Sequence, residues 1–416
     1  MKFTTALRGE ARRRVERIEK ADILVGIPSY NNEETIAYVV RMAGEGLATY
    51  YPNLKCMVMV ADGGSTDDTR EIAFETEVPP WVEKIVTIYR GVPGKGTAFR
   101  AIFETVENLG IKACVVCDSD LRSITPEWIK YLADPIIKHG YQYVAPLYAR
   151  YKYDGTITNN IVYILTRTLY GKQIRQPIGG DFGFSHDLAK FYSDQDIWET
   201  DVARYGIDIW MTTLAITEGF RICQSRLGVK IHDPKDPSAA LGAMFREVVM
   251  TLFTLMSKYE DQWRKVKGSS PTEIFGEEQM PEPEPVQVNL PKLIENFKLG
   301  FDHFSVLWRE IIDSENFNEL TKVTYHSTEE FHIPIELWAK ILYNFAATFH
   351  KWTKDRYKLI DVMTPLYYGK VASFVIQTKD MSTSQAEEII DKEAMVFETL
   401  KSYLLKKWEG KHESTI

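Results

Sequence analysis

The chain has 416 residues, of which 44% are hydrophobic, so it is long enough to bury a sizeable core and to form more than one domain. Its formal net charge of −8 leaves no broad basic surface to bind a phosphate backbone, which excludes nucleic acid as an expected partner. No apolar run approaches the roughly 20 residues that span a bilayer, and no apolar leader is visible. We therefore expect a cytoplasmic protein without a transmembrane segment.

Composition and periodicity divide the sequence into four blocks. Residues 1–20 predict a basic helix, either solvated or in contact with an anionic membrane. Residues 21–265 begin with apolar runs that alternate with helical stretches, which is typical of an α/β domain with a mostly parallel, doubly wound sheet. Residues 266–291 are rich in proline and glutamate and predict a linker, and residues 292–416 predict an almost wholly helical region.

The helical C-terminal block carries a clear apolar face. Leu337, Ile341, Phe345 and Phe349 recur at steps of four residues. Such a face predicts packing against the catalytic domain, and the alternative is a subunit interface in a homodimer.

Polar loops follow the first four predicted strands, and they read PSYNNEET, ADGGSTDDT, RGVPGKGTA and DSDL. In parallel α/β sheets, ligands bind beyond the carboxyl ends of the strands, so these loops should meet at one edge. Asp62 is the better ligand candidate in the second loop, because Asp67 and Asp68 fall where a helix begins. Lys95 stands between glycines and presents a cation suited to a phosphate, although the spacing is not that of a Walker motif.

Asp118 and Asp120 end the fourth apolar strand. Because they are two residues apart on an extended segment, their carboxylates project to the same side. Two carboxylates so close repel each other, and a divalent cation such as Mg2+ or Mn2+ relieves the repulsion while leaving positions for phosphate oxygens. The pair predicts a metal site. His232, after a short apolar strand, is a further ligand candidate, with packing or capping as the alternative.

These motifs together resemble the GT-A glycosyltransferases, which bind a nucleoside diphosphate sugar through a metal held by a DxD motif. The later stretches QPIGGDFGFS, YGIDIWMTTLAITEG and IHDPKDPSAALGAMFREVVMTLF resemble the glucosyl-3-phosphoglycerate synthases and mannosylglycerate synthases, retaining enzymes of compatible-solute synthesis. The resemblance implies a Rossmann-like GT-A domain, with a nucleotide-sugar half at 21–121 and an acceptor half at 122–265, followed by the helical C-terminal region. It also implies a divalent metal, a UDP- or GDP-linked glucose or mannose as donor, and D-glycerate or 3-phosphoglycerate as acceptor.

The resemblance assigns roles to residues at matching positions. Pro28, Tyr30 and Glu33 would hold the nucleoside, Asp62 would lie near the base, and Lys95 would bind the diphosphate. Asp118 would contact the ribose or the metal, whereas Asp120 would bind the metal directly and His232 would complete the ligand set. Asp208 would be the catalytic carboxylate on the acceptor side. The residues expected to bind the acceptor are Arg150, through its carboxylate, and Thr158, Ile178, Gly179 and Gly180.

Two departures from the family pattern bear on the acceptor. Both families tend to have an arginine after the metal histidine, whereas this chain has Asp233, and the DGTIT loop lacks the arginine of the phosphoglycerate enzymes. A carboxylate there disfavours an extra phosphate, which favours unphosphorylated glycerate. Lys152, Lys172 or Arg175 would supply the missing cation if the acceptor is phosphorylated.

Three other functions compete with this interpretation. A glycosyltransferase with a polyprenyl-phosphate or cell-wall acceptor would share the nucleotide half, but the sequence lacks an evident membrane segment. A sugar nucleotidyltransferase would need a glycine-rich, arginine-containing first loop, which PSYNNEET does not supply. A degenerate, regulatory protein would have no reason to keep Lys95, Asp118, Asp120, Asp208 and His232 intact.

Overall fold

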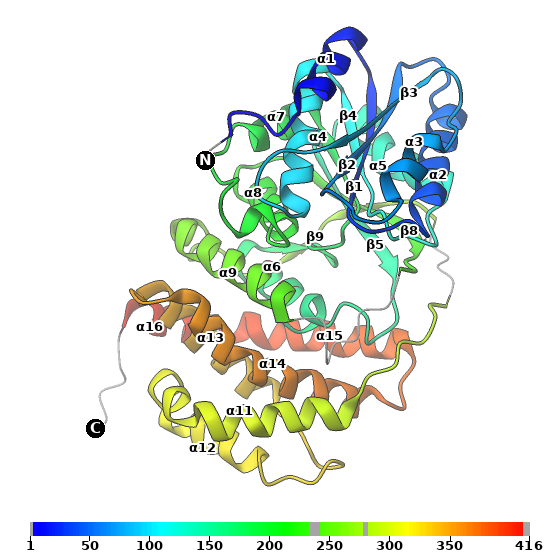
Figure 1. The fold of residues 1–416 in the computed structure, drawn as a ribbon. Helices are drawn as coiled ribbons and strands as arrows, with labels where there is room; N and C mark the ends of the chain where they lie inside the picture. The colour runs from blue at the N-terminus through cyan, green and yellow to red at the C-terminus, as the bar shows by residue number, and fades with distance from the viewer. Residues whose placement is uncertain (1–2, 233–241, 278–281, 411–416) are drawn as a thin grey trace. The chain divides into compact units, whose positions relative to one another are not determined.

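The computed structural model describes residues 3–232, 242–277 and 282–410, and it separates the chain into two compact units. The first, which we name the sheet unit, consists of residues 1–150, 174–233 and 271–284; the second, the helical unit, consists of residues 151–173, 234–270 and 285–416. Each unit is therefore built from discontinuous stretches of the chain, as the colours in Figure 1 show.

The two units cut across the boundaries predicted from composition. Residues 151–173 and 234–265, which the sequence placed in the catalytic domain, are grouped with the C-terminal helices. The predicted linker at 266–291 contributes strand β10 (Glu273–Phe275), which pairs in parallel with β8 (Ile222–Val229) at the edge of the sheet. The sequence does not predict this strand, because a strand of three residues shows no periodicity of its own. The division of function among the four blocks stays a prediction.

The sheet unit contains an eight-stranded sheet in the order β10-β8-β5-β7-β4-β1-β2-β3 in the part of the chain that is described. Its strands pair in parallel, except that β7 runs antiparallel to β4 and β5. The remaining strands are β1 (Ile23–Ser29), β2 (Cys56–Asp62), β3 (Val82–Ile88), β4 (Ala113–Val116), β5 (Tyr143–Ala149) and β7 (Phe182–Ser185). The predicted mostly parallel α/β architecture is confirmed.

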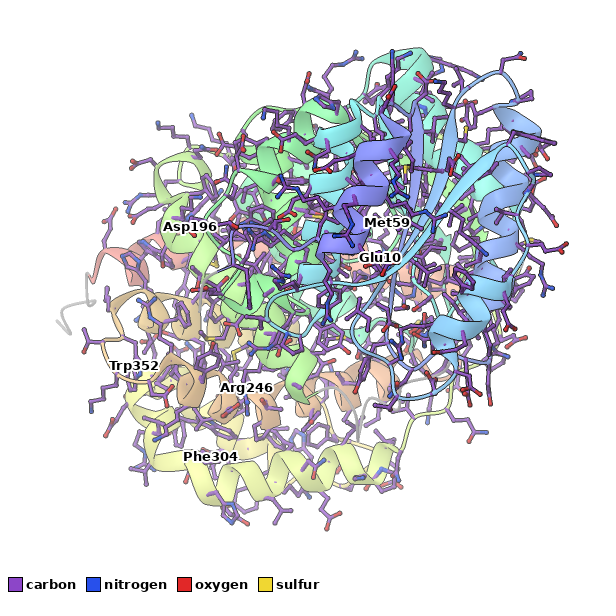
Figure 2. All side chains as sticks on the ribbon, turned by 45° about the horizontal axis from the view of Figure 1, so that its top comes forward. Glu10, Met59, Asp196, Arg246, Phe304 and Trp352 are labelled. Atoms are coloured by element: carbon purple, nitrogen blue, oxygen red, sulfur yellow. The ribbon has the colours of Figure 1, made fainter. Side chains whose placement is uncertain are left out.

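Helices cover both faces of this sheet, which explains why β1 and β2 are buried at every position. Val25 and Val58 belong to the core cluster that α2 and α5 cover, whereas Gly26 faces α4. A Cβ atom at Gly26 would lie 2.6 Å from Cδ1 of Ile102, so only glycine lets α4 approach this closely. Met59, labelled in Figure 2, is fully buried in β2. The helices are α1 (Gly9–Ile18), α2 (Ile36–Tyr50), α3 (Thr69–Glu75), α4 (Lys95–Leu109), α5 (Pro126–His139), α7 (His186–Ser193) and α8 (Ile207–Thr217), with a 3-10 turn η2 (Asp201–Ala203).

The helical unit confirms the predicted helical C-terminal region and extends it. Its elements are the π-helical turn η1 (Thr158–Val162) and helices α6 (Tyr163–Tyr170), α9 (Gly242–Lys258), α10 (Glu260–Trp263), α11 (Leu290–Ile311), α12 (Ser314–Val323), α13 (Ile335–Lys351), α14 (Arg356–Thr378), α15 (Thr383–Thr399) and α16 (Lys401–Glu409). Two short strands, β6 (Lys172–Gln173) and β9 (Ser270–Pro271), pair with each other as a separate sheet.

Aromatic contacts and one ion pair join α9 to the C-terminal helices. The ring centroids of Phe245 and Tyr367 are 4.7 Å apart, and Arg246, labelled in Figure 2, lies 2.6 Å from Asp361. The predicted apolar face of α13 is buried, and α13 contacts α9, α14, α15 and α16. That face is therefore used inside the helical unit.

Helix α14 is, among the described helices, the one whose length and composition would suit a membrane span. Of its apolar 18-residue window, 72% is buried inside the structure. That burial is the pattern of a core helix.

Lys152 caps the carboxyl end of α14. Its ammonium donates hydrogen bonds to the carbonyl oxygens of Thr378, Lys379 and Met381 at 2.6, 3.2 and 2.6 Å. The last turn of a helix leaves carbonyl groups without helical partners, and this lysine satisfies them. Because all three of its donors are engaged, Lys152 is occupied by a structural role.

We expect Lys152→Met to lower the free energy of unfolding by about 2–3 kcal/mol, because the carbonyl groups of Thr378, Lys379 and Met381 lose a charged donor. Lys379→Met is the matched control, since its side chain is exposed at the same helix end. Urea denaturation followed by circular dichroism measures both variants. Equal midpoints for the two would contradict the capping role.

Candidate functional site

The loops that follow the parallel strands meet at the carboxyl edge of the sheet, as the sequence predicts. Strands β1, β2, β3, β4, β5 and β8 run in one direction and end there. Because β7 is antiparallel, its amino end lies at this edge as well, and Asp181 immediately precedes it. One edge therefore collects groups from distant parts of the sequence.

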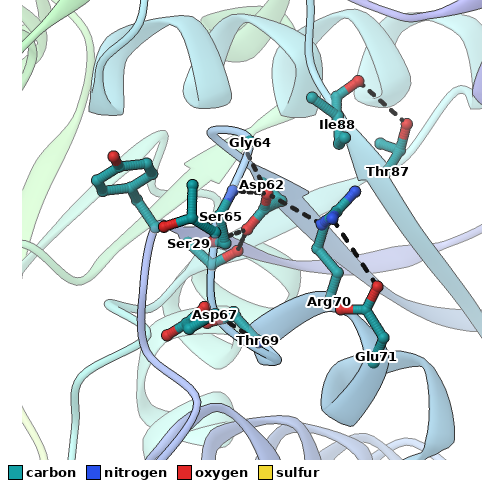
Figure 3. A network of polar contacts seen from close by, with 12 residues as sticks. Ser29, Asp62, Gly64, Ser65, Asp67, Thr69, Arg70, Glu71, Thr87 and Ile88 are labelled. Atoms are coloured by element: carbon teal, nitrogen blue, oxygen red, sulfur yellow. Dashed lines mark hydrogen bonds and ion pairs between the residues drawn. The ribbon is translucent and has the colours of Figure 1, made fainter.

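Asp62 holds the second loop together (Figure 3). Its carboxylate accepts hydrogen bonds from the hydroxyl groups of Ser29 and Ser65 at 2.9 and 2.6 Å. It also accepts bonds from the backbone N–H groups of Gly64 and Ser65 at 2.8 and 2.7 Å. These bonds occupy the lone pairs of a fully buried carboxylate, so Asp62 shapes the loop here. Its contact with a nucleoside base stays a prediction.

The first loop is tied to the second through Glu33. The Glu33 backbone donates to the Asp67 carboxylate at 3.2 Å, and the Glu33 carboxylate accepts from the Asp68 backbone at 3.1 Å. Asp67 and Asp68 thus lie at the start of α3, as the sequence predicts. Pro28 lies in β1, and Tyr30 follows that strand with 60% of its surface exposed.

Lys95 brings three of the predicted residues together. It is the first residue of α4, and its Nζ lies 2.8 Å from Oδ1 of Asp118 and 3.4 Å from Oδ2 of Asp208. Asp208 stands in the first turn of α8, and its other oxygen, Oδ1, is buried without a hydrogen-bond partner among the described residues. A buried oxygen of this kind can accept a hydrogen bond from a hydroxyl group of a ligand.

Sequence reasoning missed two residues of this cluster, Lys230 and Asp181. Lys230 Nζ lies 2.8 Å from Oδ2 of Asp118 and 2.8 Å from Oδ2 of Asp181. Oδ1 of Asp181 accepts the backbone N–H of Asp118 at 2.8 Å, and the Tyr148 hydroxyl donates to Oδ2. Asp181 stands in the stretch QPIGGDFGFS and Lys230 immediately precedes the stretch that begins IHDPKD, so a charge next to an apolar strand was the available signal.

Burial and neighbouring charges act in opposite directions on these groups. Burial alone would raise the pKa of Asp118, but the ammonium groups of Lys230 and Lys95 hold that pKa well below its usual range. Burial likewise would lower the pKa of Lys95, yet Asp118 and Asp208 raise it. Burial raises the pKa of Asp208, and Lys95 offsets only part of that effect.

The predicted acceptor turn, Ile178–Gly179–Gly180, lies directly against Asp118. The Gly179 carbonyl accepts a hydrogen bond from Lys230 at 2.9 Å. Gly180 has a φ angle of 92°, and a Cβ atom there would overlap Oδ2 of Asp118. Only glycine satisfies both the backbone conformation and this close approach.

Arg150, Asp120 and His232 lie on neighbouring segments beside this cluster. Arg150 follows β5, and its Nη2 is 3.4 Å from Nε2 of His232. His232 forms an antiparallel bridge with Leu121, the residue after Asp120. The DxD segment and the segment after β8 therefore run side by side.

The predicted metal ligands are not gathered as expected. Within the described residues, no three histidine, cysteine or acidic side chains form a group able to hold a metal ion. Asp118 pairs with two lysines, which leaves Asp120, partly exposed, and His232. Mg2+ commonly takes one or two protein ligands and completes its shell with substrate phosphates and water. Asp120 and His232 therefore fit a metal that binds together with a diphosphate, and the full ligand set stays a prediction.

The described edge of the sheet unit does not test two other sequence-predicted features. Thr158 belongs to the helical unit, where it is buried at the start of η1. Asp233 lies outside the described residues. The roles of both in acceptor binding stay predictions.

A mostly parallel sheet with a lysine–aspartate cluster at its carboxyl edge agrees with the GT-A fold expected from the sequence. In agreement, residues 24–198 match the family model described as Glycosyl transferase family 2. This stretch of the chain is therefore a glycosyltransferase family 2 region, and it spans β1 to the segment after α7.

Several solved structures are similar to part of the chain. One is glucosyl-3-phosphoglycerate synthase from Mycobacterium tuberculosis in complex with Mg2+ and UDP, with 24% identity and a TM-score of 0.46, covering 58% of this chain and 83% of that chain. Another is the same enzyme with Mn2+, UDP and phosphoglyceric acid, with 23% identity and a TM-score of 0.45, covering 58% of this chain and 82% of that chain. A search of curated proteins finds no match.

We expect Gly180→Ala to lower the free energy of unfolding by about 3 kcal/mol, because the methyl group adds overlap with Asp118 to the strain of a positive φ. Gly64→Ala is the matched control: its φ is 86°, but a Cβ atom there meets nothing within 4 Å. It should therefore cost only about 1 kcal/mol. Denaturation midpoints that fall equally would contradict the close contact between Gly180 and Asp118.

Proposed function

We propose that the chain is a metal-dependent hexosyltransferase that moves glucose or mannose from a UDP- or GDP-linked donor to D-glycerate or 3-phosphoglycerate, with retention of configuration. Such a reaction would serve compatible-solute synthesis in the cytoplasm. The observation that carries the proposal is the Lys95–Asp118 ion pair at the carboxyl edge of the glycosyltransferase region. The motif resemblance supports the sugar and the acceptor.

On the donor side, Lys95 would bind the diphosphate. It stands at the first position of α4, where the helix dipole and free backbone N–H groups favour an anion. In the leaving group, negative charge grows on the diphosphate, and a fixed ammonium stabilises that charge. A divalent metal, held by Asp120 and His232, would supply further neutralisation of the same oxygens when bound.

On the acceptor side, Arg150 would pair with the carboxylate of glycerate. A guanidinium binds a carboxylate through two parallel hydrogen bonds, which fixes the direction of the attacking hydroxyl. Asp208 would accept a hydrogen bond from a substrate hydroxyl through its unpaired Oδ1, and its raised pKa, caused by burial, suits a group that exchanges protons.

The choice between glycerate and 3-phosphoglycerate depends on cations near the acceptor. Lys152 was one of three cations that would admit the phosphate, and its ammonium is engaged at the end of α14. Lys172 and Arg175 are left as candidates for that role. The smaller number of available cations favours the unphosphorylated acceptor, and so does the negative charge of Asp233 in the sequence.

The test is nucleoside diphosphate release from UDP- and GDP-linked glucose and mannose, each with D-glycerate or 3-phosphoglycerate. We expect one donor to turn over with glycerate in the presence of Mg2+ or Mn2+, and EDTA to abolish that turnover. Turnover with 3-phosphoglycerate alone would keep the reaction class and discard the preference for glycerate. No acceptor-dependent turnover with either compound would contradict the proposal, and a polyprenyl phosphate would then be assayed as the alternative acceptor.

Arg150→Ala separates acceptor binding from donor binding. We expect the KM for glycerate to rise about 100-fold, because a charge-assisted bidentate contact is worth about 3 kcal/mol. The KM for the donor should stay within about twofold. Arg122→Ala, in the neighbouring segment after the DxD motif, is the control for loss of a positive charge. An unchanged glycerate KM in Arg150→Ala would contradict the carboxylate contact.

A further inference from the structure

Lys230 is a buried cation with no donor left for a substrate. Its side chain is 4% exposed, and an ammonium group has three hydrogen-bond donors. These donors are used by Oδ2 of Asp118, Oδ2 of Asp181 and the carbonyl of Gly179, at 2.8, 2.8 and 2.9 Å. The ring of Tyr148 closes the remaining side, with its centroid 5.2 Å from Nζ. Lys230 therefore acts through other residues.

The Asp118 carboxylate is divided between two lysines of different character. Oδ1 faces Lys95 and Oδ2 faces Lys230, both at 2.8 Å. Lys95 is 17% exposed at the start of α4, whereas Lys230 is held on all sides. The Asp118 backbone N–H is also fixed, because it donates to Oδ1 of Asp181. Asp118 therefore keeps its place if Lys95 moves.

The charges explain why a second lysine is needed. Three carboxylates, those of the partly exposed Asp118 and the buried Asp181 and Asp208, face two ammonium groups, those of Lys95 and Lys230. A diphosphate that draws Lys95 away would leave the largely enclosed Asp118 carboxylate, which is 23% exposed, without a counterion if Lys230 were absent. Such an uncompensated charge is strongly unfavourable. With Lys230 in place, the ammonium of Lys95 can exchange one anion for another.

We propose that Lys230 is a positioning residue: a permanent counterion of Asp118 that releases Lys95 to bind the donor diphosphate and holds the Gly179–Gly180 turn against Asp118. This inference rests on the proposed function and assigns to that site a residue outside its substrate contacts. Lys95 is the exchangeable counterion and Lys230 the fixed one. The same ammonium joins the donor side, through Asp118, to the acceptor turn, through Gly179.

The test is the binding of UDP and GDP to the full chain, measured by calorimetry at a fixed Mg2+ concentration. In Lys230→Met, Lys95 becomes the only counterion of Asp118, so the diphosphate must compete for it. We expect the dissociation constant to rise about 10- to 100-fold. Lys112→Met is the matched control, because this lysine pairs with Asp22 at the surface with 63% of its side chain exposed. Its affinity should equal that of the wild type.

A second variant separates positioning from a general loss of stability. Lys230→Met combined with Asp181→Asn restores the net charge of the buried cluster, since one cation and one anion are removed together. The asparagine keeps an oxygen for the Asp118 backbone N–H. We expect this double variant to recover the unfolding midpoint but to keep the weak nucleotide binding, because Asp118 still depends on Lys95 alone.

The outcomes distinguish this inference from the function on which it rests. Wild-type affinity in Lys230→Met, or in the folded double variant, would overturn the positioning role and leave the proposed function intact. Failure of the wild-type chain to bind either nucleotide would overturn the proposed function, and the role of Lys230 with it. Weak binding in both Lys230 variants and wild-type binding in Lys112→Met would support the inference.

Discussion

The neutralisation of buried carboxylates at the carboxyl edge of the sheet is the constraint on which the rest of the site depends. Asp118, Asp181 and Asp208 come from three separate segments; Asp181 and Asp208 are buried and Asp118 is partly exposed, so each needs a counterion. Lys95 and Lys230, which begin α4 and follow β8, supply the opposite charges. Each charge needs its partner to remain neutralised. The ion pairs therefore hold helices α4 and α8 and the strands in place relative to one another within the sheet unit.

The antiparallel strand β7 gives this edge a feature that a purely parallel sheet lacks. A parallel strand presents only its carboxyl end, whereas β7 presents the segment before its first residue. That segment carries Gly180, whose missing side chain admits the Asp118 carboxylate, and Asp181, which fixes the Asp118 backbone. The reversal of one strand thus places the turn predicted to bind the acceptor against the motif predicted to bind the donor.

The sequence predicts what local pattern encodes. The apolar runs and polar loops up to DSDL indicate the strands, the edge at which ligands bind, and the candidates Lys95 and Asp118. The sequence does not predict that Lys230 pairs with Asp118 and Asp181, because these partners lie 112 and 49 residues away and no local periodicity links them to Lys230. The sequence does not predict the grouping of α9 for the same reason: its residues indicate an apolar face, but whether the sheet or α14 covers that face is decided by tertiary packing.

Charge balance also bears on how a diphosphate enters a site that already holds more carboxylates than ammonium groups. Lys95 and Lys230 together carry one charge fewer than the three carboxylates that they pair with, and a diphosphate adds further negative charge. Lys95 alone cannot compensate both the excess carboxylate and the diphosphate, because its release from Asp118 and Asp208 removes a cation from the cluster. A divalent cation at Asp120 and His232 would correct this imbalance without disturbing Lys230. Protonation of Asp208, favoured because burial raises its pKa, would reduce the excess further. The DxD motif predicts metal dependence, and the charges of the surrounding residues independently favour the binding of a divalent cation.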